Sequence, residues 1–194
     1  MIRIVIFCCL CLSFISCKQD KNSSAKENIE TDAASTKESF FPVTNYLKGQ
    51  VYEVQKNGVN PIKYVTTGSR TDSSWIKMED FTREVAPFLD VLIDTQNLVQ
   101  LFEEKKFLDQ TIDAYTFSYD PVKQLPDTFT LRHWDVYVDP STNKVRRIYL
   151  VRVSENKTQQ LTWQSGKWCK MVTISNGTNG KAYVEKDILI KWDF

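Results

Sequence analysis

The sequence predicts an α+β fold, with about three helices packed on one face of a curved, mainly antiparallel sheet of roughly six to eight strands. Between residues 42 and 105 apolar residues recur at helical spacing, apart from one short hairpin. After Ile112 they alternate with polar residues, as in a half-buried strand. Short Asp-Pro, Ser-Gly and Asn-Gly turn signals separate these later segments, which favours antiparallel neighbours. Helices followed by a run of strands are typical of the α+β class.

Three helices are expected. The first begins at Pro42 and ends at Asn57, where Gly58 can cap it, and its apolar face is formed by Val43, Tyr46, Leu47, Val51 and Val54. The second is predicted from the spacing of Phe81, Val85, Phe88 and Leu89, and Pro87 should kink or stop it. The third should be capped by Asp94 or Thr95 and carry Leu98, Leu101, Phe102 and Lys105.

A short hairpin is predicted between the first two helices, from residues 62–67 and 73–77 joined through Gly68-Ser69-Arg70. The remaining strands are expected at residues 114–119, 129–138, 145–153, 159–164, 168–174 and 183–192. Both faces of residues 145–153 carry apolar side chains. A strand with two apolar faces is expected near the centre of a sheet.

The first seventeen residues indicate where the protein resides. Arg3 precedes an apolar run from Ile4 to Leu12, and polar sequence follows Cys17, which is the layout of a secretory signal. A spanning helix would need about 20 apolar residues, so this run is too short to stay in the membrane. We therefore expect a signal peptide at 1–16, a lipidated cysteine with a disordered tether at 17–39 and one globular domain at 40–194.

The residues before Cys17, Phe14-Ile15-Ser16, resemble the lipobox of bacterial lipoproteins, with Phe14 in place of the usual Leu. The resemblance implies that Cys17 is lipidated and that acyl chains attach the protein to the membrane. Lys18 after the cysteine favours an outer-membrane lipoprotein of the cell envelope, and the start Lys-Gln-Asp-Lys is similar to Bacteroidota lipoproteins. The periplasmic and the surface side stay open. The alternative is an unlipidated secreted protein that is cleaved elsewhere.

Residues 18–39 are almost entirely polar, with Ile29 as the only large apolar residue, and such a composition predicts disorder. As a flexible linker the segment would have a root-mean-square reach of about 25 Å. It would hold the domain close to the membrane and let it turn.

Charge and cysteine count exclude several function classes. Loss of residues 1–16 removes Arg3 and no acidic residue, which leaves basic and acidic residues in balance and argues against nucleic-acid binding. After lipidation of Cys17, Cys169 would be the only free thiol, so no intramolecular disulfide is expected. One cysteine and the single histidine, His133, cannot supply a usual zinc or iron–sulfur site, and no metal or cofactor is predicted.

His133 and Asp135 are the weak catalytic candidates. They lie two residues apart in a predicted strand, so they should project from one face, where the carboxylate could orient the imidazole as a general base. No third member of a catalytic set is identifiable. The reading that we favour is a structural histidine bonded to its neighbours, with Asp135 facing solvent or an arginine.

Trp163 and Trp168 are the candidate ligand or partner surface. With Ser165-Gly166 as the two central turn residues, the indoles would face each other across a hairpin, either over the core or as an exposed platform. Two functions follow. The favoured one is a non-enzymatic binding or envelope-assembly module that meets an envelope protein, a glycan or an apolar ligand; the alternative is a small envelope hydrolase using His133 with Asp135.

Overall fold

The computed structural model describes residues 39–93, 98–177 and 180–193. The signal peptide, Cys17 and nearly all of the tether therefore lie outside the described residues. The elements, in chain order, are α1 (Val43–Asn57), β1 (Ile62–Thr67), β2 (Arg70–Trp75), a 3-10 turn η1 (Met78–Asp80), α2 (Phe81–Glu84), α3 (Ala86–Leu89), β3 (Phe102–Asp109), β4 (Ala114–Pro121), β5 (Leu131–Val138), β6 (Val145–Ser154), β7 (Lys157–Gln164), β8 (Trp168–Asn176) and β9 (Ala182–Lys191).

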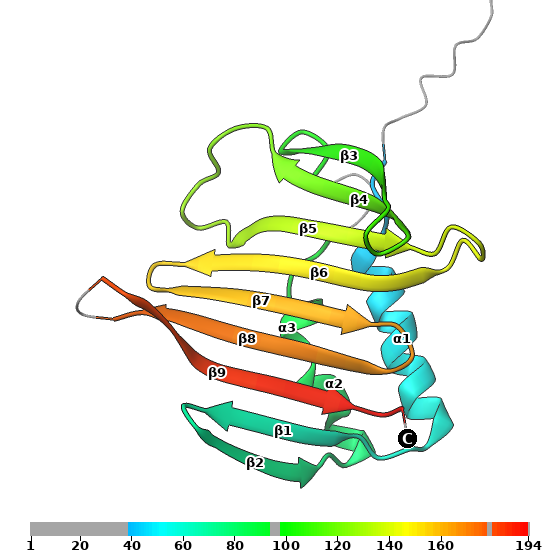
Figure 1. Cartoon of the computed structure of the whole chain (residues 1–194), viewed down its shortest axis with the longest axis vertical. Helices are drawn as coiled ribbons and strands as arrows, with labels where there is room; N and C mark the ends of the chain where they lie inside the picture. Colours follow the sequence, from blue (N-terminus) through cyan, green and yellow to red (C-terminus); the bar gives the residue numbers. More distant parts are fainter. Residues whose placement is uncertain (1–38, 94–97, 178–179, 194) are drawn as a thin grey trace, which may run out of the picture. The chain divides into compact units, whose positions relative to one another are not determined.

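All of these strands form one sheet, in the order β2-β1-β9-β8-β7-β6-β5-β4-β3, and every neighbouring pair is antiparallel (Figure 1). Strands β3 to β9 follow one another as a meander, and the β1–β2 hairpin adds to the free edge of β9. The prediction of a mainly antiparallel sheet with helices is confirmed. The predicted six to eight strands were too few, since the described residues form nine.

The missing strand is β3, which lies where the third helix was expected, and that prediction was wrong. Residues 98–101 make a single turn, in which the amides of Leu101 and Phe102 both donate to the carbonyl of Leu98, at 2.9 and 3.0 Å. This turn explains the helical spacing of the leucines. Charged and exposed residues occupy both faces of the β3 edge strand between Phe102 and Asp109, so its period of two cannot be seen in the sequence.

The second helix is interrupted, as predicted. Helices α2 and α3 are separated at Val85, and Pro87 lies in the first turn of α3, where its missing N–H costs no helical hydrogen bond. The described residues thus contain three α-helices, the predicted number, but only because the second predicted helix is divided into α2 and α3.

Helix α1 ends at Asn57 as the sequence predicts, and it begins at Val43, one residue after the predicted Pro42, which is the N-cap. Gly58 follows it with φ of 68°, a left-handed conformation that glycine adopts without strain, and its N–H donates to Gln55. The buried Thr44 hydroxyl donates to the carbonyl of Val91 at 2.8 Å and accepts from the amide of Ile93 at 2.8 Å. These bonds attach the segment after α3 to the start of α1.

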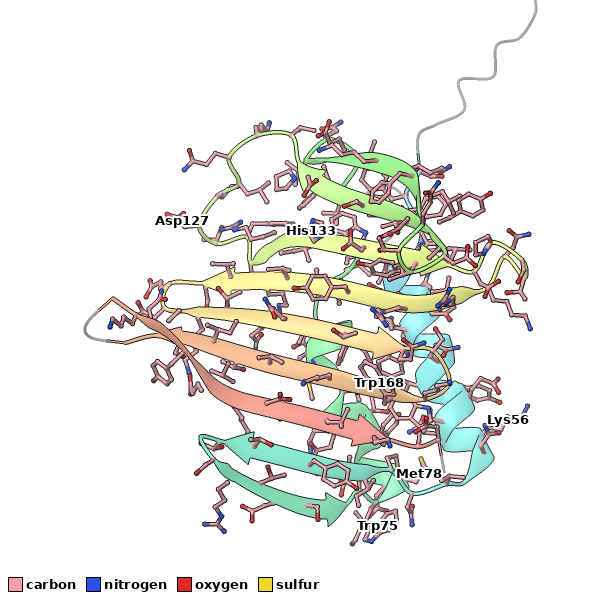
Figure 2. The ribbon with its side chains drawn as sticks, viewed as in Figure 1. Lys56, Trp75, Met78, Asp127, His133 and Trp168 are labelled. Atoms are coloured by element: carbon pink, nitrogen blue, oxygen red, sulfur yellow. The ribbon has the colours of Figure 1, made fainter. Side chains whose placement is uncertain are left out.

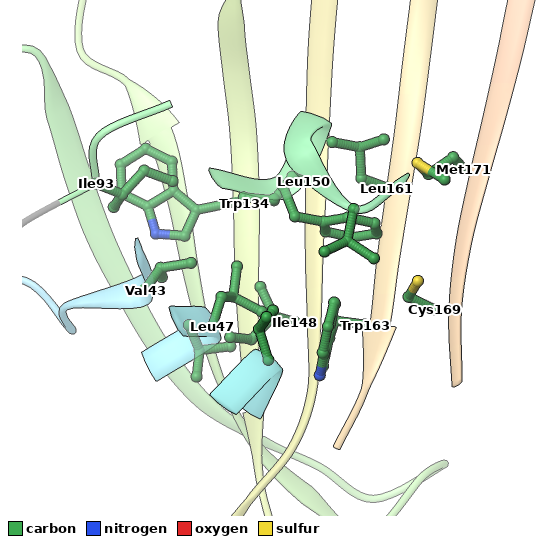
Figure 3. Packing of buried hydrophobic residues seen from close by; sticks show 14 of the residues in the cluster. Val43, Leu47, Ile93, Trp134, Ile148, Leu150, Leu161, Trp163, Cys169 and Met171 are labelled. Atoms are coloured by element: carbon green, nitrogen blue, oxygen red, sulfur yellow. The ribbon is translucent and has the colours of Figure 1, made fainter. Parts of the chain in front are cut away.

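The hydrophobic core lies between the helices and one face of the sheet (Figure 3). Leu47 of α1 packs with Ile148 and Trp163 of the sheet, and all three are fully buried. Trp163 also meets the ring of Phe88 from α3, with 5.3 Å between ring centroids. Burial of side chains this large supplies most of the free energy that holds helices to a sheet.

The opposite face of the sheet has no helix over it in the part of the chain that the structure describes (Figures 1 and 2). We call it the open face. Strand pairing arranges the side chains of the open face in three rows that run across the strands from β5 to β2. The first row contains Tyr137, Arg147, Gln164, Trp168, Lys191, Ile62 and Trp75. The second row contains Asp135, Tyr149, Thr162, Lys170, Leu189, Tyr64 and Ser73, and the third contains His133, Val151, Gln160, Val172, Asp187, Thr66 and Thr71.

The predicted early hairpin forms, but its second strand begins at Arg70 and ends at Trp75, because the turn is shorter than expected and uses Gly68 at a φ of 60°. Strand β6, predicted to be central, lies inside the sheet between β5 and β7. Among the described residues, no helix has the length and apolar character needed to cross a membrane.

Candidate functional site on the open face

The predicted pairing of His133 with Asp135 is present at the centre of the candidate site. Both residues belong to β5 and project onto the open face, and Nε2 of the imidazole lies 3.0 Å from Oδ2 of Asp135. Figure 2 places His133 on the same side of the sheet as Trp168. The two candidates thus lie in direct contact, as the alternation of side chains along a strand requires.

A second carboxylate, which the sequence did not indicate, takes the other ring nitrogen. Tyr119 of β4 pairs with Trp134 of β5, so the adjacent residues Asp120 and His133 lie side by side. Nδ1 of His133 lies 2.9 Å from Oδ1 of Asp120. Because both ring nitrogens face carboxylate oxygens, the arrangement favours the imidazolium form, in which each nitrogen donates a proton.

The electrostatics agree with this arrangement. The hydrogen bond to Asp135, against the opposing effect of burial and with further help from Asp120, raises the pKa of His133 above its ordinary value. Burial alone would raise the pKa of Asp135, but hydrogen bonds from His133, Ser118 and Tyr137 outweigh it and lower that pKa. The shifts of His133, Asp120 and Asp135 therefore all favour the charged forms, with a cation held between two anions.

Further polar groups complete the cluster. The Tyr137 hydroxyl donates to Oδ2 of Asp135 at 3.0 Å, and Nζ of Lys105 lies 3.3 Å from Oδ2 of Asp120. The ring of Tyr149 meets His133 edge-on, with 6.3 Å between centroids. Lys105 is shared between Asp120 and Glu103, whose Oε1 lies 2.9 Å from its Nζ.

This geometry does not suit His133 as a general base. A base needs a free ring nitrogen within reach of the proton that it removes, and each nitrogen of His133 already lies within hydrogen-bond distance of a carboxylate oxygen. The neighbouring hydroxyls of Ser118 and Tyr137 bond to Asp135. Cys169 is fully buried on the other face, where burial raises the pKa of its thiol and keeps it protonated.

The structure separates Trp163 from Trp168. The turn after β7 pairs Gln164 with Trp168 and Trp163 with Cys169, so the predicted register was wrong by one residue. The turn contains Ser165, Gly166 and Lys167, with Gly166 at a φ of 72°, and its extra residue shifts the pairing. A one-residue shift turns a side chain to the other face.

As a result the two indoles do not form a shared platform. Trp163 is fully buried beneath the helices and packs against Phe88 and Trp192, whereas Trp168 is half-buried on the open face between Gln164 and Lys191. Only Trp168 of the pair is available to a ligand.

No group of three or more histidine, cysteine, aspartate or glutamate side chains able to hold a metal ion occurs among the described residues. Cys17, the predicted lipidation site, lies outside them. Comparison with known families, curated proteins and solved structures finds no match for this chain.

Proposed function

We propose that the chain is a lipoprotein of the bacterial cell envelope, anchored through acyl chains on Cys17, whose domain is a non-enzymatic binding module. The resemblance of residues 14–17 to a lipobox supports the anchor. An outer-membrane location, with the domain held at the membrane by the tether, belongs to the same proposal.

The open face carries the binding part of the proposal. In the part of the chain that the structure describes, the helices cover one face of the sheet only, and the open face displays Tyr64, Trp168, Val172 and Leu189 among polar groups. Each of these side chains is half-buried by its neighbours on the face alone. Side chains fixed in rows on a rigid sheet lose little conformational freedom when a ligand binds, which favours recognition.

The alternative hydrolase loses support from the same face. His133 donates from both nitrogens to Asp120 and Asp135, so the imidazole is held as a structural cation. We infer that this charged cluster fixes β4 to β5 and shapes the polar end of the binding surface.

Site-specific photo-crosslinking in intact cells tests the proposal. A photoreactive phenylalanine analogue replaces Val172, at the centre of the open face, and in a matched control replaces Tyr52, which is 61% exposed on α1. We expect discrete and reproducible adducts from position 172 and none from position 52. Adducts from position 52 alone, or none from position 172, would contradict the open face as the binding surface.

A further inference from the structure

Two consecutive arginines at the start of β6 are brought to one cavity by a β-bulge. In a regular strand, Arg146 and Arg147 would point to opposite faces. Here Arg147 pairs with Tyr137 while Val145 pairs with Val138, which leaves Arg146 as an extra residue without a partner on β5. Such bulges redirect side chains, and this one lets both guanidinium groups border the same space.

That space is a cavity of about 210 Å³ at the β6 end of the first row of the open face, lined by Ile112, Ala114, Tyr137, Arg146, Arg147 and Gln164. Protein groups hold both arginines in place. Nη1 of Arg146 donates to the carbonyls of Asp113 at 2.8 Å and Ile112 at 3.3 Å, and Nε of Arg147 donates to Oε1 of Gln164 at 3.2 Å. The Arg147 guanidinium also lies 5.8 Å from the ring centre of Tyr137.

The charge of these two arginines is not balanced locally. Among the described residues, no carboxylate lies within 4.0 Å of either guanidinium, whereas Lys170 on the same face pairs with Asp187 at 2.8 Å. The second Nη of Arg146, both Nη atoms of Arg147 and the amide nitrogen of Gln164 have no hydrogen-bond acceptor among the described residues. Both arginines are exposed, so these donors and two positive charges are accessible to an anion that enters the cavity.

We propose that this cavity binds a phosphate group carried on a small organic moiety. A phosphate monoester has three terminal oxygens and nearly two negative charges, which match Arg146, Arg147 and Gln164, and a diester has two terminal oxygens that can each accept more than one hydrogen bond. The cavity also has room for a few carbon atoms against Ile112 and Ala114. This inference rests on the proposed binding function and names its ligand class; the phosphate can belong to a lipid headgroup or to a soluble compound.

Isothermal titration calorimetry of the full chain in detergent, at low ionic strength, tests the inference. The probes are inorganic phosphate, glycerol 3-phosphate and the diester glycerophosphoglycerol. We expect the wild type to bind at least one of them and Arg147→Gln to weaken that binding about tenfold or more, as the loss of a charge-assisted hydrogen bond predicts. Binding of the diester indicates a lipid headgroup, and binding of monoesters alone indicates a soluble phosphorylated compound.

Arg132→Gln is the matched control. Arg132 is also the extra residue of a bulge in the β5–β6 pair, and it also donates to a backbone carbonyl, that of Phe129, but it does not line this cavity. Its substitution should leave the affinity unchanged. Arg147→Gln carries the test because Arg146 additionally holds the turn before β4, and thermal unfolding checks that each variant is folded.

Two results would overturn the inference: no binding of any probe, or equal binding by the wild type and Arg147→Gln. Either result leaves the photo-crosslinks from position 172 unaffected. Failure of the phosphate site is thus distinguishable from failure of the proposed binding function.

Discussion

The indoles of Trp163 and Trp168 lie on opposite faces of the sheet, because the β7–β8 turn pairs Trp163 with Cys169. Trp163 packs under α3 against Phe88, with no exposed surface. Trp168 belongs to the open face, in the same row as Arg147 and Lys191. The first indole therefore stabilises the core, and the second is free to contribute to binding.

Replacement of these two residues by alanine should have unequal effects on stability. Trp163→Ala removes a fully buried indole and should lower the free energy of unfolding by about 3–5 kcal/mol. Trp168→Ala should cost clearly less, because its side chain is only half-buried. Urea unfolding of both variants measures the difference. Equal losses would show that Trp168 is also a core residue.

The charged cluster predicts how stability depends on pH. The pKa of His133 is raised in the folded state, so its contribution is fully present below about pH 6.5 and is lost as the pH rises through the folded pKa. His133→Gln should cost about 1–3 kcal/mol at pH 6, where two charge-assisted hydrogen bonds are lost.

Urea midpoints of the wild type and His133→Gln at pH 6 and pH 9 test this linkage. The difference between the two proteins should shrink at the higher pH. At the acid end, the lowered pKa of Asp135 means that its contribution is present above about pH 3.8 and is lost as the pH falls through the folded pKa. A difference between the two proteins that is constant from pH 6 to pH 9 would show that folding does not shift the pKa of His133.

The sequence predicted correctly those elements in which the local residue pattern favours the same structure as the packing of the folded protein. Helix α1 has a regular apolar stripe and a glycine cap, and its observed bounds, Val43–Asn57, differ from the predicted ones by one residue at the start. Strand β3 was missed because an edge strand needs no apolar alternation, and the one helical turn at residues 98–101 supplied a misleading period.

The candidate site could be predicted only where it depends on one strand. His133 and Asp135 share a face because they are two residues apart, and this required no knowledge of the sheet. The partnership of His133 with Asp120 depends on the register of β4 against β5, and the joint position of Arg146 and Arg147 depends on a bulge. Neither feature has a signal in the spacing of residues along the chain.

The membrane anchor predicts the behaviour of a single substitution. Cys17→Ala should move the protein from the membrane pellet to the soluble fraction and abolish acyl labelling, because no acyl chain can then be attached. Cell fractionation with immunodetection measures the distribution. A pellet fraction that is unchanged by the substitution would contradict the lipoprotein proposal.

The tether predicts selective proteolysis. Brief trypsin treatment should cut at Lys21, Lys26 or Lys37, where the polar composition predicts disorder, and should leave a core that starts near Phe40. Lys63 in β1 is the internal control, since its side chain is bonded to Glu84 at 2.8 Å and its backbone belongs to the sheet. Mass spectrometry of the fragments identifies the sites. Protection of Lys26 would show that the segment is docked.

The account depends most on His133 being a structural cation within a binding module. Nitrogen-15 NMR of the imidazole ring, followed from pH 5 to pH 9, measures the protonation of each ring nitrogen directly. We predict that the ring titrates with a pKa above its ordinary value of about 6.5 and that both nitrogens are protonated below that pKa. A ring that is singly protonated at pH 7, with a pKa below that value, would contradict the account and restore His133 as a general base.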